Sequence, residues 1–255
     1  MKTIYLEKDL FSEDERCDTQ AIISKYFNIE YVDLTKALEM VRNSIFSPYF
    51  RGSLNVAALL GYRFDHANAL VWASALRKHL LFPSETKFSD LDYYYNYYTD
   101  KDFATTFIRP VHGFKSFSGQ VFGSRDKFIQ EYNFMTKNKN ISPDLLCMES
   151  PKMEINREYR CVFVNGKYVS GSLYMIDGKL DMYPFVPEHV INFATKLSSH
   201  TMFSNVFNFV IDVATIEESC YLLEVNAFET ASFYASDLDK IYKALTEDPD
   251  EKEYE

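Results

Sequence analysis

Two apolar runs near the C-terminus, FNFVID at 207–212 and CYLLEVN at 220–226, decide the fold. Both are rich in aromatic and aliphatic residues, and a short polar segment with Glu217, Glu218 and Ser219 separates them. Apolar runs on either side of a polar turn predict a β-hairpin. The sequence therefore predicts a pair of buried antiparallel strands in this region.

The register of this hairpin brings acidic side chains together. A three-residue loop closed by residues 216 and 220 would place Asp212 directly opposite Glu224. Asn226 would then lie on the same face, because side chains alternate along a strand with a period of two. Two facing carboxylates roughly 5 Å apart repel each other, so the hairpin needs a compensating positive charge.

A divalent cation is the compensating charge that we predict. The neighbours of the two carboxylates are apolar on both faces, which indicates a buried strand pair in which unpaired carboxylates are costly. Mg²⁺ prefers oxygen ligands from carboxylates and amides. The sequence thus predicts a metal site formed by Asp212, Glu224 and Asn226. The alternative is that both carboxylates are solvated near the end of the hairpin.

Composition limits the class of protein. The chain has 255 residues, of which 47% are hydrophobic and 25% charged, so it can bury a core in one large domain or two modest ones. Its formal charge of −10 argues against general nucleic-acid binding, which needs a basic surface. No apolar run approaches the roughly 18 residues that span a membrane. The four cysteines show no metal-ligand spacing, so we expect reduced thiols in a cytoplasmic protein without nucleic-acid or membrane partners.

Local signals predict where several elements begin and end. Asn165-Gly166 and Asp177-Gly178 separate alternating apolar segments, which predicts two tight hairpin turns. Thr35 is the predicted N-cap of a helix over Thr35–Arg42, and Ser124 is the predicted N-cap of a helix over Ser124–Thr136.

A basic segment in the middle of the chain is a candidate phosphate-binding element. Asp and Glu make up 37 of the 255 residues, but none lies between Ala104 and Arg125. The segment contains the basic residues Arg109, His112, Lys115 and Arg125, and a small-residue loop at Gly113–Gly119. Backbone N–H groups and cations of such a hairpin can together cover a polyphosphate. The segment is not a Walker loop, and the alternative is a basic hairpin that binds nothing.

A third segment adds a candidate site for a nucleoside. The predicted strand Leu145–Glu149 is followed by Glu158 and Arg160, which project from one face of the next strand. A strand edge that leads into a linker can pair with an adenine edge through its backbone, and a nearby carboxylate can accept hydrogen bonds from ribose hydroxyls. Taken alone, this segment is better explained as a surface meander.

Taken together, these segments resemble the ATP-grasp fold, and in particular the short phage-type ATP-grasp proteins. The resemblance covers roughly residues 100 to 235. It is carried by FIRP at 107–110, GFKSFSGQVFG at 113–123, LLCMES at 145–150, REYRCVFVNGKYVSGSLY at 157–174, VID at 210–212 and LLEVN at 222–226.

The resemblance implies an α/β (α+β) protein with the ATP-grasp fold and a small N-terminal α/β pre-ATP-grasp domain. Strand and helix patterns alternate over the first 85 residues, as such a domain requires. We therefore predict a pre-ATP-grasp-like domain at 1–85, an ATP-grasp domain at 86–246 and an acidic tail at 247–255. Within the ATP-grasp domain we predict a central lid subdomain at about 101–148 and a C-terminal subdomain at about 149–246.

The resemblance also implies roles for nucleotide-binding residues. Arg109 lies where the family usually has a strand lysine on the nucleotide phosphates, and Lys115 lies in the loop that closes over them. Met148 and Glu149 fall at the hinge that contacts adenine, and Glu158 falls near the ribose.

For the metal, the resemblance implies the same three ligands as the hairpin register: Asp212, Glu224 and Asn226. Many relatives have an arginine two residues before the metal-binding aspartate, where this chain has Val210. We expect Arg160, from a neighbouring strand, to take over the phosphate contact of that missing arginine.

The activity implied by the resemblance is ATP- and Mg²⁺-dependent ligation of a carboxylate to an amine through an acylphosphate. The partners would be ATP, a carboxylate and an amine, the last two from an amino acid, a peptide or a protein terminus. Arg109, Lys115 and Arg160 would be the catalytic cations. Two alternatives remain: a non-catalytic module that binds nucleotide or protein, and a kinase that transfers phosphate and stops. The sequence leaves open whether the chain forms a homodimer.

Overall fold

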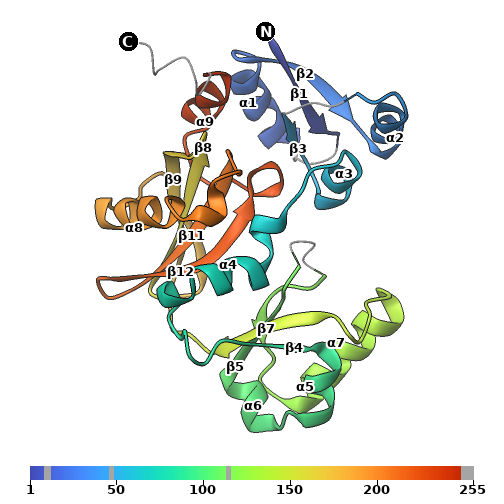
Figure 1. Cartoon of the computed structure of the whole chain (residues 1–255), viewed down its shortest axis with the longest axis vertical. Coiled ribbons are helices and arrows are strands. Elements are labelled where there is room, and N and C mark those ends of the chain that lie inside the picture. Colours follow the sequence, from blue (N-terminus) through green and yellow to red (C-terminus); the bar gives the residue numbers. More distant parts are fainter. Residues whose placement is uncertain (9–12, 46–48, 113–115, 248–255) are drawn as a thin grey trace.

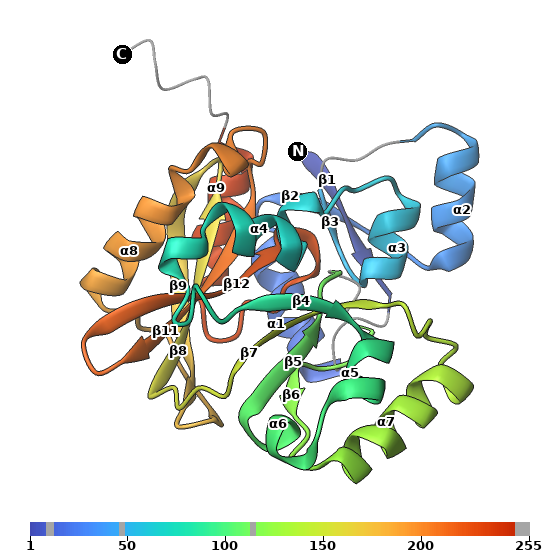
Figure 2. The same cartoon turned by 60° about the horizontal axis from the view of Figure 1, so that its bottom comes forward.

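Three β-sheets organise the chain, and helices pack around them (Figures 1 and 2). The computed structural model describes residues 1–8, 13–45, 49–112 and 116–247. In Figure 1 the three-stranded sheet lies at the top, the five-stranded sheet to the left and the four-stranded sheet at the bottom. The mixed helix and strand content confirms the predicted fold class.

The N-terminal sheet is parallel, and helices connect its strands. It consists of β1 (Lys2–Glu7), β2 (Phe27–Val32) and β3 (Phe50–Arg51) in the order β2-β1-β3, with helices α1 (Glu13–Ile23), α2 (Leu34–Arg42) and α3 (Leu54–Leu59). Parallel strands need such helical crossovers, so this part of the chain is an α/β unit, as expected.

Helix α2 begins earlier than the sequence predicted. The carboxylate of Asp33 accepts a hydrogen bond from the backbone N–H of Lys36 at 2.9 Å and is therefore the N-cap. Thr35, the predicted cap, lies inside the helix. Asp and Thr are both good N-cap residues. Asp33 comes first along the chain and takes the N-cap position. The Ser124 cap of helix α7 is confirmed.

The four-stranded sheet carries the aromatic core of the middle of the chain. Its strands are β4 (Lys87–Asp90), β5 (Thr106–Pro110), β6 (Gln120–Val121) and β7 (Leu146–Pro151) in the order β4-β7-β5-β6, and its helices are α5 (Leu91–Tyr97), α6 (Asp100–Thr105) and α7 (Arg125–Asn138). Phe103 stacks on Phe128 with ring centroids 4.5 Å apart, and Tyr94 is fully buried beside them. This core fixes the strand that carries Arg109.

The five-stranded sheet is antiparallel. Its strands are β8 (Arg157–Val164), β9 (Lys167–Ile176), β10 (Lys179–Tyr183), β11 (Phe209–Ile216) and β12 (Ser219–Ala227) in the order β10-β9-β8-β11-β12. Helices α4 (Ala69–Ala75), α8 (Glu188–Ser198) and α9 (Leu238–Thr246) pack on it, and short 3₁₀ helices are η1 (Asp65–Ala67), η2 (Arg77–His79), η3 (Thr201–Phe203) and η4 (Phe228–Thr230). Both turns predicted at Asn165-Gly166 and Asp177-Gly178 are confirmed, with all four residues at positive φ.

The β11–β12 hairpin has the predicted Asp212–Glu224 pair but a different turn. Ile216 pairs with Ser219, which leaves a two-residue turn rather than the predicted three-residue loop. Leu223 is an extra residue in a β-bulge, so the register shifts by one and Asp212 still pairs with Glu224. The predicted register at the acidic pair is therefore right, although the predicted loop is wrong.

The two faces of the five-stranded sheet bury different partners. Cys161, Phe163 and Ile211 pack toward helices α4 and α8. Val162 and Val210, which are next to Cys161 and Ile211 in the sequence, belong to the core shared with the N-terminal sheet and α9. This alternation follows the period of two along a strand. Farther along the second face the apolar residues give way to charged ones, and those form the site.

The limits of the predicted domains stay predictions. Trp72, Leu76 and Leu80 lie within the first 85 residues, but they are buried in the core of the five-stranded sheet. Within the described residues, no helix is both long and apolar enough to cross a membrane.

Replacing Phe209 by alanine tests the core of the five-stranded sheet. Its ring stacks between Phe163 and Phe203, with centroids 5.0 Å and 4.2 Å away. We expect Phe209→Ala to lower the free energy of unfolding by about 3–5 kcal/mol, because truncating a buried aromatic ring leaves a cavity. Phe207→Ala, two residues earlier and 63% exposed, should change it by less than about 0.5 kcal/mol. Urea unfolding measures both, and similar losses would contradict this packing.

Candidate functional site

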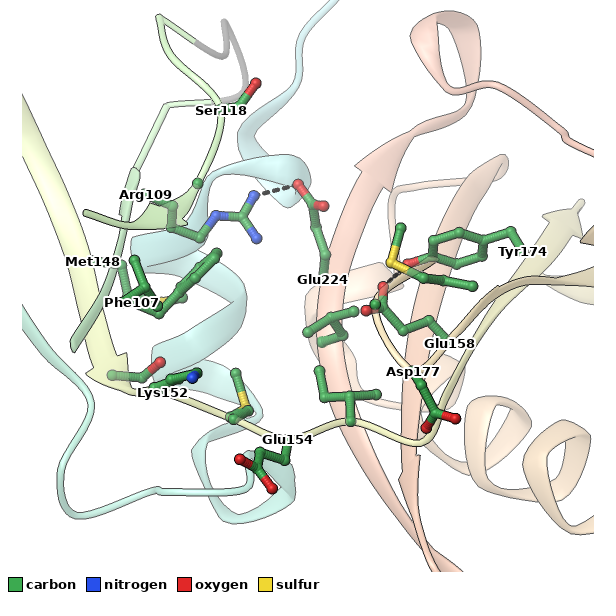
Figure 3. A pocket seen from close by; sticks show the side chains of 18 of the residues that line it. Phe107, Arg109, Ser118, Met148, Lys152, Glu154, Glu158, Tyr174, Asp177 and Glu224 are labelled. Atoms are coloured by element: carbon green, nitrogen blue, oxygen red, sulfur yellow. Dashed lines mark hydrogen bonds and ion pairs between the residues drawn. The ribbon is translucent and has the colours of Figure 1, made fainter. Parts of the chain in front are cut away.

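A cavity of about 800 Å³ lies between the four-stranded and five-stranded sheets. One wall comes from β5, β7 and the segment 150–156, and the other from β8, β9 and β12 (Figure 3). Phe107, Arg109 and Met148 face Glu158 and Glu224 across it. The structure thus brings the three predicted segments of the sequence to one place.

An ion pair closes this cavity at one end. Arg109, on β5, donates a hydrogen bond to Glu224, on β12, and both side chains are less than one-fifth exposed (Figure 3). Gly119 makes room for the arginine, because a Cβ there would lie 2.9 Å from the Cβ of Arg109 and 2.5 Å from the Phe107 ring. The pair links the two sheets and holds a cation next to a carboxylate.

A second arginine compensates the other predicted metal ligand. The carboxylate of Asp212, which is 1% exposed, accepts hydrogen bonds from Arg160 Nε at 2.8 Å and Nη2 at 2.7 Å. Asn226 Nδ2 donates to the same carboxylate at 2.9 Å, and Arg160 Nη1 donates to the Ser232 carbonyl at 2.7 Å. Burial is the largest single influence and lowers the pKa of Arg160, but the charge of Asp212, its hydrogen bonds and the two nearby tyrosines together outweigh burial and raise the pKa of the guanidinium.

These contacts concern two predictions. Each of the two carboxylates faces a guanidinium from a different strand, so two arginines reduce the Asp212–Glu224 repulsion besides any metal ion, and the metal site stays a prediction. Arg160 directs its donors at Asp212 and Ser232 and thereby positions Asp212. Its contact with phosphate stays a prediction.

Two tyrosines that the sequence did not single out, Tyr174 and Tyr234, pack on Arg160, and Tyr174 also lines the cavity. The rings of Tyr174 and Tyr234 stack with centroids 4.7 Å apart, and the Arg160 guanidinium lies 4.7 Å from the centre of the Tyr234 ring. Tyr174 donates its hydroxyl to Glu158 at 2.6 Å. Burial raises the pKa of Glu158, and the hydrogen bond from Tyr174 counteracts this. Tyr174 lies at the end of the quoted segment 157–174, but nothing in its spacing indicated a role.

The predicted adenine hinge is only partly at the cavity. Met148 is buried and lines it, followed along the chain by Ser150 and residues 152–156. Glu149 is buried as well, but its carboxylate accepts a hydrogen bond from the Tyr98 hydroxyl. The Glu149 side chain therefore does not line the cavity. Lys152 and Glu154 do (Figure 3), and the sequence analysis missed both.

The basic segment is divided by the structure. Lys115 lies outside the described residues, whereas Ser118 and Gly119 of the same loop line the cavity. Arg125 lies elsewhere: it donates to the carbonyls of Tyr95 and Tyr98, at 2.7 Å and 3.2 Å, and thereby joins helices α5 and α7. Arg125 therefore does not line the cavity.

The donor set fits a hard cation. Glu224 and Asn226 line a small adjoining cavity together with Arg109. Because Asn226 donates through its nitrogen to Asp212, its oxygen is left to act as a ligand. Carboxylate and amide oxygens are what Mg²⁺ prefers. No cluster of three or more His, Cys, Asp or Glu suited to a metal occurs among the described residues, so this mixed set is the metal-site candidate.

A third arginine, Arg51, is also buried and fixes the loop after β12. Arg51, in β3, donates to the carbonyls of Phe228 and Ala231 and lies 3.9 Å from the Phe233 ring centre. Arg160 holds the same loop through Ser232. The N-terminal sheet and the five-stranded sheet therefore clamp one loop between them.

A double-variant cycle tests the buried ion pair. Arg160→Met should lower the free energy of unfolding by about 3–5 kcal/mol, because it leaves Asp212 buried without a cation. The double variant Arg160→Met/Asp212→Leu should recover most of this loss, because no buried charge remains. Urea unfolding of the wild type, both single variants and the double variant gives the coupling energy. Equal losses in Arg160→Met and the double variant would refute the ion pair as the source.

Comparisons with known proteins agree with this geometry. A family model described as the ATP-grasp domain of R2K clade family 2 matches residues 87–244. No curated protein is detectably similar in sequence. The structure of D-alanine–D-alanine ligase from Bacillus anthracis is similar, with a TM-score of 0.57 and 12% identity over 96% of this chain and 94% of that one.

Two further solved structures have the same fold. D-cycloserine synthetase gives a TM-score of 0.57 at 12% identity over 96% of this chain and 98% of that one. A RiPP-associated ATP-grasp ligase from Chryseobacterium gregarium gives 0.52 at 12% identity over 96% of each chain. The chain belongs to the ATP-grasp superfamily, in R2K clade family 2.

Proposed function

We propose that this chain is an ATP- and Mg²⁺-dependent ligase that joins a carboxylate to an amine through an acylphosphate. The observation that carries the proposal is the Arg109–Glu224 ion pair at the end of a cavity of about 800 Å³ between two sheets of an ATP-grasp fold. A cation suited to phosphate and a carboxylate suited to a metal ion are in contact there. Phosphoryl transfer depends on positioning such groups around the phosphates.

The nucleotide would lie along this cavity. The adenine would contact Met148 and the backbone of Glu149 at the hinge, while the Tyr98 hydroxyl holds the Glu149 carboxylate. Glu158, held by Tyr174, would accept hydrogen bonds from the ribose hydroxyls. Arg109 would exchange its contact with Glu224 for the phosphates. Lys115, outside the described residues, is proposed as a second cation over them.

Atoms and charges balance in two steps. A carboxylate oxygen attacks the γ-phosphorus of ATP, the bond to the bridging oxygen breaks, and ADP leaves. The amine then attacks the acyl carbon, phosphate leaves, and one proton is released to solvent. Arg109 and Lys115 would neutralise the charge that develops on the transferring group. Mg²⁺, held by Glu224, Asn226 and Asp212, would add charge neutralisation.

Solved structures of the same fold support the choice of substrates. One is a D-alanine–D-alanine ligase from Bacillus anthracis complexed with ATP. Another is the Chryseobacterium gregarium ligase, in complex with ADP and a leader and core peptide. The finer resemblance of the FIRP and GFKSFSGQVFG segments to short phage-type proteins remains part of this proposal.

Product analysis tests the reaction. The protein is incubated with Mg²⁺-ATP and a panel of amino acids and short peptides, and ADP, phosphate and organic products are measured. We expect ADP and phosphate in equal amounts, and a product one water lighter than its two precursors. A phosphorylated product without an amide would identify a kinase, and no ADP above background would support a non-catalytic module.

Glu224→Gln tests the metal-binding carboxylate. The amide keeps the shape of the side chain but removes the charge that attracts the cation, so we expect ADP formation to fall by about 100-fold or more. Circular dichroism should report an unchanged fold. Glu218→Gln, in the exposed turn of the same hairpin, is the matched control and should retain wild-type turnover. Wild-type activity in Glu224→Gln would remove Glu224 from the site.

A further inference from the structure

Three further cavities share lining residues in a series that begins at the Arg109–Glu224 pair. A cavity of about 60 Å³ is lined by Arg109, Glu224 and His112. His112 also lines the next cavity, of about 320 Å³. Arg63 and Asp65 line both that cavity and a third, of about 910 Å³. We call these three cavities the acceptor groove.

A positive and a negative side chain, Arg63 and Asp65, lie at the middle of the groove. Arg63 and Asp65 are both exposed and line two of the three cavities, and the backbone carbonyl of Asp65 accepts a hydrogen bond from the Asn68 N–H at 3.1 Å. Both charged residues belong to the linker between α3 and α4, which crosses from the N-terminal sheet to the five-stranded sheet (Figure 1). A ligand lying along this linker would therefore meet a cation and an anion side by side.

The outer cavity contains an unpartnered buried polar atom. His66 is 8% exposed, lines this cavity, and its Nε2 has no hydrogen-bond partner among the described residues. Burial lowers the pKa of His66 to about 4, so the ring is neutral at pH 7. Buried polar atoms nearly always have a partner. A backbone amide or carbonyl group of a ligand would supply one.

The rest of the outer cavity suits a polypeptide. Its wall includes Asn165, Asn205 and Asn208, and also Phe207, which is 63% exposed. Asn165 Nδ2 donates to the carbonyls of Ala244 and Glu247, and Asn208 Oδ1 accepts from the Asn165 N–H, so Asn205 is the asparagine best placed to meet a ligand. Amides can donate to and accept from a peptide backbone, and an exposed ring can pack against a side chain. The volume also exceeds what one amino acid needs, because cavities of 300–1,000 Å³ usually hold much larger ligands.

We infer that the carboxylate substrate is a peptide, which lies in the acceptor groove with its reacting carboxylate at Arg109 and its remaining residues reaching Phe207. This inference rests on the proposed function, since it names the substrate class of the same reaction. His112, Arg63 and Asp65 would contact the residues next to the reacting end. A free amino acid would fill only the part of the groove nearest the Arg109–Glu224 pair.

The test compares carboxylates of two lengths. An N-acetylated random pentapeptide mixture and a mixture of N-acetylated amino acids are each supplied with Mg²⁺-ATP and hydroxylamine, which traps an acylphosphate as a hydroxamate and releases phosphate. We expect kcat/KM for the pentapeptides to exceed that for the amino acids by at least about tenfold, equivalent to about 1.4 kcal/mol. Equal values would overturn the inference while leaving the proposed function intact.

Matched variants locate the effect in the outer cavity. Phe207→Ala should reduce the preference for pentapeptides over amino acids by about tenfold. Phe185→Ala is the control, because Phe185 is also 63% exposed and lines none of the three cavities. Equal preference ratios in the two variants would overturn the role of the outer cavity.

A peptide-binding measurement shows whether the peptide inference or the proposed reaction is at fault when no product forms. Fluorescence anisotropy with a fluorescein-labelled pentapeptide mixture needs no turnover. If neither mixture gives ADP or hydroxamate, the proposed reaction is wrong. Weaker peptide binding by Phe207→Ala than by Phe185→Ala would still support a peptide groove, whereas identical or absent binding would overturn it.

Discussion

The buried charge of Asp212 is the constraint on which the site depends. A carboxylate that is 1% exposed is stable only if it is paired and hydrogen-bonded. Arg160 supplies both hydrogen bonds of a bidentate pair, and its remaining donor fixes the Ser232 carbonyl. Tyr174 and Tyr234 hold the guanidinium from one side. One electrostatic requirement thus determines the positions of strands β8 and β11 and of the loop after β12.

One face of the five-stranded sheet contributes both to the core and to the site, because its side chains are apolar at one end of the strands and charged at the other. Val162 and Val210 bury it against the N-terminal sheet and α9. Beyond them, Glu158, Arg160 and Asp212 continue the same alternation with polar side chains. Since rigid strands place these groups, the site needs little reorganisation to meet a nucleotide. Arg109 adds the opposite wall from a separate sheet.

Sequence reasoning predicted what depends on local periodicity. The Asp212–Glu224 pair and the turns at Asn165-Gly166 and Asp177-Gly178 follow from strand alternation and turn chemistry. It missed what depends on distant contacts: Arg160 is 52 residues from Asp212, and Arg109 is 115 residues from Glu224. No local sequence pattern indicates which cationic side chain will pair with a buried carboxylate. The Asp33 cap and the two-residue turn were missed because neighbouring residues are equally suited to those positions.

The bulge at Leu223 has a consequence for how the hairpin can change in evolution. It adds one residue to β12 and so offsets the two-residue turn. Loss of one residue between Ser219 and Glu224 would remove the bulge, and an unbroken ladder from the Ile216–Ser219 pair would still place Glu224 opposite Asp212. Loss of two residues would instead bring Val225 opposite Asp212 and turn Glu224 to the apolar face. The hairpin should therefore tolerate the loss of one residue from β12 in evolution, but not the loss of two.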